Sequence, residues 1–99
     1  MNLKQKRDGE KLTIFIDGRI DTNTAPTLND YLEKELPGAK DLTLDIEKVD
    51  YISSAGLRVL LVSKKSIDAK GGRMIVKNAN NNIMDIFTIT GFATILEFE

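Results

Sequence analysis

The 99-residue chain contains no cysteine and no histidine. Their absence excludes disulfides, thiol nucleophiles, Cys/His zinc sites and the imidazole base of a Ser-His-Asp triad. There is also no excess of positive charge, because 14 Lys and Arg residues face 15 Asp and Glu residues, for a formal net charge of −1. Proteins that bind nucleic acid use such an excess to neutralise phosphates, so we expect no direct nucleic-acid partner.

Long apolar segments are missing as well. The longest aliphatic runs, such as residues 59–62, are far shorter than the roughly 20 apolar residues of a membrane-spanning helix. The basic residues before position 8 are followed by Asp8, Gly9 and Glu10 instead of the apolar stretch of a signal peptide. We therefore expect a cytoplasmic protein without a membrane partner. The length suits a single domain over residues 1–99 with one hydrophobic core, able to exist as a monomer.

The first third of the chain predicts a β-hairpin. Residues 11–17 alternate apolar and polar side chains with a period of two, which is typical of a half-buried strand. A shorter alternation over residues 3–6 precedes them, and Asp8-Gly9 between the two segments is a signal for a tight turn. The chain is therefore expected to open with two antiparallel strands.

The remaining segments alternate between helix and strand patterns. A helix is expected after Asp21, with caps from residues 22–24, Pro26 in its first turn and Pro37-Gly38 as its end. Its apolar positions are Ala25, Leu28, Leu32 and Leu36. A strand over 41–46, a strongly buried helix from Leu57 to Gly71-Gly72, a strand over 73–77, a short helix over 83–91 and a last strand over 93–98 complete the chain. The stripe of the buried helix comprises Leu57, Leu60, Leu61 and Ile67, widened by Val59 and Val62.

The order β-β-α-β-α-β-α-β predicts an α/β fold with one mixed sheet. Strand-helix-strand crossovers make neighbouring strands parallel, whereas the opening hairpin is antiparallel. We expect Met74, Met84 and Phe87 to belong to the core because they occupy apolar periodic positions. Lysines 64, 65 and 70, with Asp68, are expected to form an ordinary solvated face.

The segment most able to carry chemistry is Tyr51–Leu57, where a loop delivers two serines to the buried helix. Ser54 is the expected N-cap, with its hydroxyl accepting from the backbone N–H of Gly56 or Leu57. The same N–H groups and the helix dipole would stabilise a phosphate on that hydroxyl, and Gly56 would let the phosphate approach the backbone. Capping alone, without modification, also explains these residues, and on physical grounds alone it is the favoured interpretation.

The whole set of motifs resembles the STAS domain family, and within it the bacterial anti-sigma factor antagonists. The resemblance covers nearly all of the chain. Its motifs are Asp17–Asp21 with Thr24-Ala25, Leu44–Ile46 with Val49, Tyr51–Leu57, Gly71-Gly72, and Ile86-Phe87 with Thr90–Phe92. The resemblance implies a single STAS domain without catalysis or a cofactor of its own.

The resemblance also implies a partner-switching function. A partner anti-sigma factor, which is also a serine kinase and binds Mg-ATP, would phosphorylate the serine that opens the second helix. The unphosphorylated form would bind that partner and release a sigma factor, and a metal-dependent phosphatase would remove the phosphate. The modified serine maps to Ser54, Gly56 matches the family glycine, and Asp21 matches an acidic residue near the site. Ser53, Ala55, Leu57 and Arg58 would support the phosphate or contact the partner.

One departure from the family pattern leaves alternatives open. The family motif reads Asp-Ser-Ser/Thr-Gly, whereas residues 53–56 read Ser-Ser-Ala-Gly, so the aspartate is replaced by Ser53. Ser53 is therefore the alternative phosphorylation site. An unmodified docking or scaffold module in a signalling complex is the alternative function, and a small enzyme or nucleotide binder that uses the helix start as an anion site is a third.

Two charged residues near the serines also have two interpretations each. Asp21 either orients the loop beside Ser54 or contacts a kinase's nucleotide, or it is a routine turn and cap residue before residues 22–24. Arg58, in the first turns of the helix, either pairs with the phosphate or the partner, or lies on a solvated charged face.

Overall fold

The computed structural model describes residues 1–99 and contains the predicted elements in the predicted order. The elements are β1 (Asn2–Asp8), β2 (Lys11–Asp17), α1 (Ala25–Glu35), β3 (Asp41–Lys48), α2 (Ser54–Ala69), β4 (Met74–Lys77), α3 (Asn81–Thr90), a 3-10 turn η1 (Phe92–Thr94) and β5 (Glu97–Phe98). The predicted α/β fold with the order β-β-α-β-α-β-α-β is confirmed.

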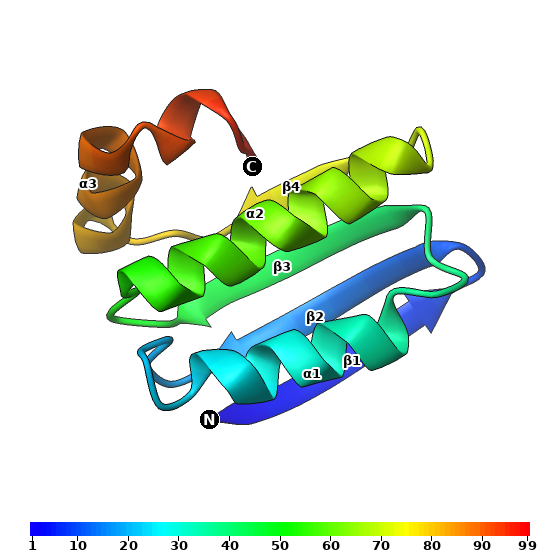
Figure 1. The fold of residues 1–99 in the computed structure, drawn as a ribbon, viewed down its shortest axis with the longest axis horizontal. Coiled ribbons are helices and arrows are strands. Elements are labelled where there is room, and N and C mark those ends of the chain that lie inside the picture. The colour runs from blue at the N-terminus through cyan, green and yellow to red at the C-terminus, as the bar shows by residue number, and fades with distance from the viewer.

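The five strands form one mixed sheet in the order β1-β2-β3-β4-β5 (Figure 1). β1 and β2 are antiparallel, and each later neighbour is parallel because a helical crossover precedes it. Asp8 pairs with Lys11, so the hairpin loop is Gly9-Glu10, one residue later than the predicted Asp8-Gly9. Gly9 has a φ of 61°, a left-handed conformation that glycine adopts without strain.

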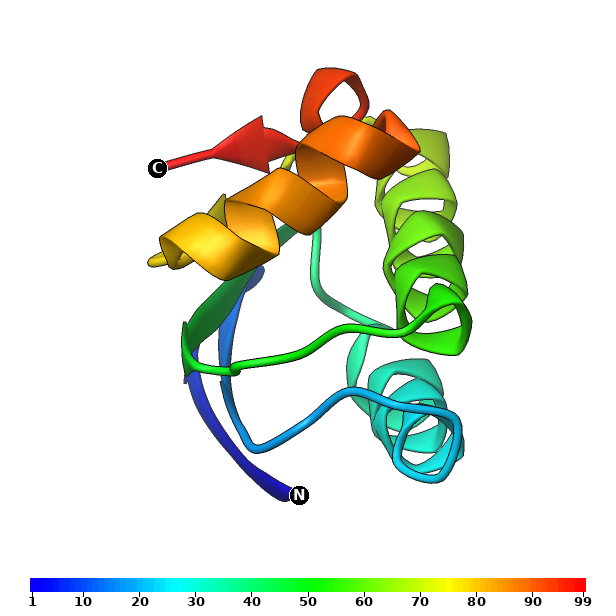
Figure 2. The same ribbon diagram turned by 90° about the vertical axis from the view of Figure 1, so that its left-hand side faces the viewer.

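The two longer helices cover one face of the sheet. In Figure 2 the sheet curves along one side of the molecule, and α1 and α2 lie side by side on the other. Strand β2 shows why, since Leu12, Ile14 and Ile16 are buried under the helices while Phe15 and Asp17 on the opposite face are exposed. The predicted alternation therefore sets which face of the sheet the helices cover.

A single core of 23 buried apolar side chains joins the sheet to the helices. Met74 and Phe87 are buried in this core, and Met84 packs against it, so all three core predictions are confirmed. Phe87 also meets Phe98 of β5, with ring centroids 5.3 Å apart. None of the helices is both long and apolar enough to span a lipid bilayer.

The C-terminal segment differs from the prediction. A strand was expected over residues 93–98, but only Glu97–Phe98 pair with β4, after the turn Phe92–Thr94. Gly91, with a φ of 84°, ends α3, and the N–H groups of Ile95 and Leu96 then donate back to the carbonyl of Phe92. This local hydrogen bonding keeps the first half of the predicted strand out of the sheet.

Two predictions for α2 were also wrong in part. Val62 was expected to widen the buried stripe, but it is 50% exposed, and Ser63 occupies a buried position instead. Lys70 is exposed, as expected, and its Nζ also donates to the carbonyl oxygens of Leu36 and Ala39, each at 2.9 Å. These carbonyls follow the end of α1, where a cation is favourable. Lys64, expected on the same solvated face as Lys70, is only partly exposed and pairs with Asp68.

We expect Gly72→Ala to lower the free energy of unfolding by about 3 kcal/mol, because overpacking at a rigid backbone contact is costly. A Cβ atom at Gly72 would overlap the carbonyl of Lys40 before β3. Gly71→Asn is the matched control, since Gly71 has open space and a φ of 73°, which asparagine tolerates. Urea unfolding followed by circular dichroism measures both variants, and equal effects would contradict the packing explanation.

Candidate functional site

Two loops meet at the carboxyl edge of the sheet and frame the start of α2. One follows β2 and the other follows β3, and parallel neighbours bring both to the same edge. Ile20 and Ile52 form a parallel bridge between the loops. The N–H of Ile20 donates to the carbonyl of Tyr51 at 2.9 Å, and the N–H of Ser53 donates to the carbonyl of Ile20 at 2.8 Å. The loop after β2 therefore fixes the position where α2 begins.

Ser53, not Ser54, is the N-cap of α2. Its backbone is extended, with a ψ of 173°, and its Oγ accepts from the N–H of Gly56 at 3.3 Å. The carbonyl of Ser53 also accepts from the N–H of Leu57 at 2.9 Å. The predicted cap at Ser54 was thus wrong by one residue. An N-cap oxygen accepts from the N–H three residues later, and the N–H of Gly56 is three residues after Ser53. Ser54 is the first helical residue, is exposed, and has no hydrogen bond from its side chain.

Gly56 is buried and packs against the loop that follows β2. A Cβ atom there would lie 2.6 Å from Cγ2 of Ile20 and 3.0 Å from the carbonyl oxygen of Ile20. Any larger residue would therefore push the first turn of α2 away from Ile20. Leu57 is buried in the core and Ala55 packs partly against it, so Gly56 and Leu57 support the site from below and do not form its surface.

Asp21 holds the turn before α1. Its Oδ1 accepts from the N–H of Asn23 at 2.9 Å and of Thr24 at 3.0 Å. Thr24, the N-cap position of α1, makes no side-chain cap bond and instead donates its hydroxyl to the carbonyl of Arg19 at 2.6 Å. Asp21 therefore closes the turn ahead of α1, whereas the side-chain cap expected from residues 22–24 does not form. The pKa of Asp21 lies below its ordinary value, chiefly because the backbone N–H of Thr24 donates a hydrogen bond to the carboxylate.

Arg19 connects the two loops, a role that no sequence pattern predicted. Its guanidinium carbon lies 4.4 Å from the centre of the Tyr51 ring, a cation–π contact, and its Nε lies 3.6 Å from Oδ2 of Asp21. The sequence did indicate that Arg19 and Tyr51 each follow one of two adjacent parallel strands. It contained no pattern that predicts a contact between these two side chains.

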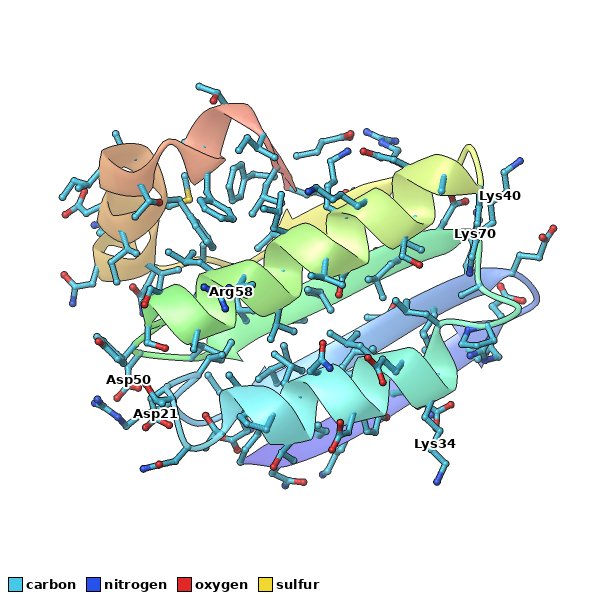
Figure 3. The ribbon with its side chains drawn as sticks, viewed as in Figure 1. Asp21, Lys34, Lys40, Asp50, Arg58 and Lys70 are labelled. Carbon is cyan, nitrogen blue, oxygen red and sulfur yellow. The ribbon has the colours of Figure 1, made fainter.

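Arg58 lies one helical turn after Ser54 on the exposed surface of α2 (Figure 3). It makes no hydrogen bond or ion pair with the rest of the chain. Arg58 lines a hollow of about 310 Å³ between the two helices, together with Ala55 and Val62 of α2 and Pro26 of α1. A second hollow of about 370 Å³ shares Asn29 and Val62 with the first and continues towards Lys70. The groove between α1 and α2 therefore starts beside the exposed serine.

The chain has no group of three or more Asp and Glu side chains placed to hold a metal ion. Figure 3 shows Asp21 and Asp50 at the end of the sheet where α2 begins, but they come from different loops. Asp21 is already engaged by backbone N–H groups and Arg19. The site therefore consists of an exposed hydroxyl, a capped helix start, an unpaired arginine and a partly apolar groove.

The STAS domain family profile matches residues 2–99, almost the whole chain. This chain belongs to the STAS domain family. It is 29% identical over 96 residues to an anti-sigma-B factor antagonist of Listeria monocytogenes, covering 96% of this chain and 84% of that protein.

Solved structures share the fold of this STAS domain. A crystal structure of a putative anti-sigma factor antagonist from Thermotoga maritima superposes with a TM-score of 0.90 at 18% identity, covering 97% of this chain and 84% of that one. The unphosphorylated anti-sigma factor antagonist SpoIIAA superposes with a TM-score of 0.85 at 15% identity, covering 99% and 88%.

The assignment of the helix cap can be tested by two serine variants of the STAS domain. Ser53→Ala removes the oxygen that accepts from Gly56 and should lower the free energy of unfolding by about 1 kcal/mol. Ser54→Ala removes an exposed hydroxyl without a partner and should change it by less than about 0.5 kcal/mol. Ser53→Asp restores a cap oxygen and serves as the control. A larger loss for Ser54→Ala in urea unfolding would return the cap to Ser54.

The acidic pH dependence of stability should depend in part on Asp21. Its folded pKa lies below the ordinary value of 3.8, so folding favours the ionised form. That stabilisation is fully present above the ordinary value and is lost as the pH falls through the lowered pKa. In urea unfolding, the midpoints of wild type and Asp21→Asn should differ by a constant amount from pH 7 to about 5 and should converge only as the pH falls below 3.8 through the lowered pKa. A difference independent of pH would contradict this.

Proposed function

We propose that this STAS domain is an anti-sigma factor antagonist whose binding to an anti-sigma factor releases a sigma factor. The antagonists of Listeria monocytogenes and of Bacillus subtilis, which align with 96% and 98% of this chain, support this role. The observation that carries the proposal is the exposed, unengaged hydroxyl of Ser54 at the first residue of α2.

Phosphorylation of Ser54 would switch this binding off. The choice of Ser54 over Ser53 is supported by the hydroxyl of Ser53, which is occupied as the N-cap acceptor for Gly56. Ser53 stands where the family motif has an aspartate, and both residue types are preferred N-caps. The replacement of this aspartate by Ser53 therefore removes a negative charge from the cap but keeps the hydrogen bond from Gly56. Related SpoIIAA has been solved in both unphosphorylated and phosphorylated forms.

The first turn of α2 can accept a phosphate without unfolding. Backbone N–H groups in a first turn lack intrahelical acceptors, and the helix dipole places partial positive charge there. The phosphate adds a charge of about −1.5 to −2 at neutral pH. This charge would have to lose its water when a partner covers Ser54, so a penalty of about 3 kcal/mol would weaken binding about a hundredfold.

The partner would supply the chemistry of the switch. We assign Mg-ATP to an anti-sigma factor that is also a serine kinase, and removal of the phosphate to a metal-dependent phosphatase, with no catalysis by this chain. The need for ATP places this cycle in the cytoplasm. The docking surface would include Ser54, Arg58 and the neighbouring groove between α1 and α2, of which Ala55 forms part.

A second candidate function is an unmodified docking module. It is favoured by the groove itself, because Val62 lies between its two hollows with half of its surface exposed. Such a module would bind its partner through α1 and α2 regardless of the state of Ser54.

One assay separates the two functions. The purified protein is incubated with its cognate anti-sigma kinase and Mg-ATP, and the phosphate is mapped by intact mass and peptide fragmentation. We expect one phosphate, on Ser54, in wild type and in Ser53→Ala, and none in Ser54→Ala, which should still bind the kinase. Ser54→Asp should bind more weakly, because it mimics part of the added charge.

Two outcomes would contradict the proposed switch. Phosphate on Ser53 in wild type would assign the modification to the cap residue. Tight binding without any phosphate, unchanged in Ser54→Ala and Ser54→Asp, would establish the docking module instead.

A further inference from the structure

Arg58 differs from the other three arginines of the chain in having no partner. Arg7 donates to the carbonyl of Glu35, Arg19 contacts Asp21 and Tyr51, and Arg73 pairs with Glu97. The guanidinium of Arg58 is exposed, although the nearby loops carry Asp21 and Asp50. Its five N–H donors are therefore available for a planar anion.

Arg58 lies four residues after Ser54 on α2. Residues four apart on an α-helix lie on one face, about 6 Å apart along the axis, and their side chains meet. An acidic group at the first position and a basic group at the fourth following position is the favoured orientation, because it also matches the helix dipole. Ser54 and Arg58 have this spacing, and both side chains are exposed and unpaired.

We propose that Arg58 is a positioning residue that pairs with the phosphate on Ser54, within α2. This inference rests on the proposed phosphorylation of Ser54 and adds how the modified state is held. The guanidinium donates to two phosphate oxygens, a charge-assisted arrangement that suits its planar geometry. The pair fixes the phosphate over the first turn of α2 and partly neutralises it.

The groups around the pair leave it free to form. Asp21 is held by the backbone N–H groups of Asn23 and Thr24 and by Arg19, so it does not occupy Arg58. Ser53 next to the site is uncharged and uses its hydroxyl for Gly56. Phosphorylation would therefore withdraw Arg58 from the surface beside the groove in addition to adding charge there.

The test uses protein with phosphoserine incorporated at position 54 during translation, so it requires no kinase. The readouts are the thermal midpoint and the second pKa of the phosphate, measured by ³¹P NMR. In the phosphorylated protein, Arg58→Gln should lower the midpoint by about 2 to 4 °C more than in the unphosphorylated protein. It should also raise the second pKa of the phosphate by about 0.3 to 0.5 unit. Arg58→Lys should change the midpoint and the phosphate pKa in the same directions but by smaller amounts.

Lys65→Gln is the matched control, because it removes the same charge from the exposed surface of α2. Position 65 lies about 16 Å along the helix from position 54, beyond the screening length at physiological salt. The control should shift both forms equally. Equal midpoint changes for Arg58→Gln in the two forms, with an unchanged phosphate pKa, would overturn the inference and leave the kinase assay on Ser54 unaffected. Failure of the kinase to modify Ser54 would in turn leave this measurement intact.

Discussion

The close contact between Gly56 and Ile20 is the constraint on which the site depends. A single added carbon at Gly56 would lie 2.6 Å from the Ile20 side chain, so the first turn of α2 can lie against the loop after β2 only with glycine there. Two backbone hydrogen bonds stabilise the same contact. The N–H of Ile20 donates to the carbonyl of Tyr51, and the N–H of Ser53 donates to the carbonyl of Ile20. The position of α2 along the sheet edge is thereby fixed by residues from two loops.

This contact also fixes the rotation of α2 about its own axis. With Gly56 and Leu57 facing the interior, Ser54 and Arg58 necessarily face solvent, one turn apart. A shift of one residue in the helix start would rotate the helix by about 100° and turn Ser54 towards the core. The exposure of the serine is thus a consequence of packing beneath it, and the cap at Ser53 stabilises the same register.

The sequence predicted what depends on periodic burial and missed what depends on contacts between distant segments. Alternation in β2 and the spacing of α1 were sufficient to predict their buried faces, because each pattern is complete within the element. The choice between Ser53 and Ser54 as the cap could not be made in that way, since both are good caps. It is decided by the extended backbone of Ser53 and the packing of Gly56. The contact of Arg19 with Tyr51 likewise requires the parallel pairing of β2 with β3.

The serine at position 53 gives the site an electrostatic character different from that of the aspartate in the family motif. A carboxylate at the cap would repel a phosphate on the next residue, whereas the hydroxyl of Ser53 retains the bond to Gly56 without charge. A phosphate on Ser54 would then encounter only favourable charge on its own helix, from the dipole and from Arg58. The phosphate would therefore make the free energy of binding to the partner less favourable without lowering the stability of the fold. The protein would change its binding while keeping its structure.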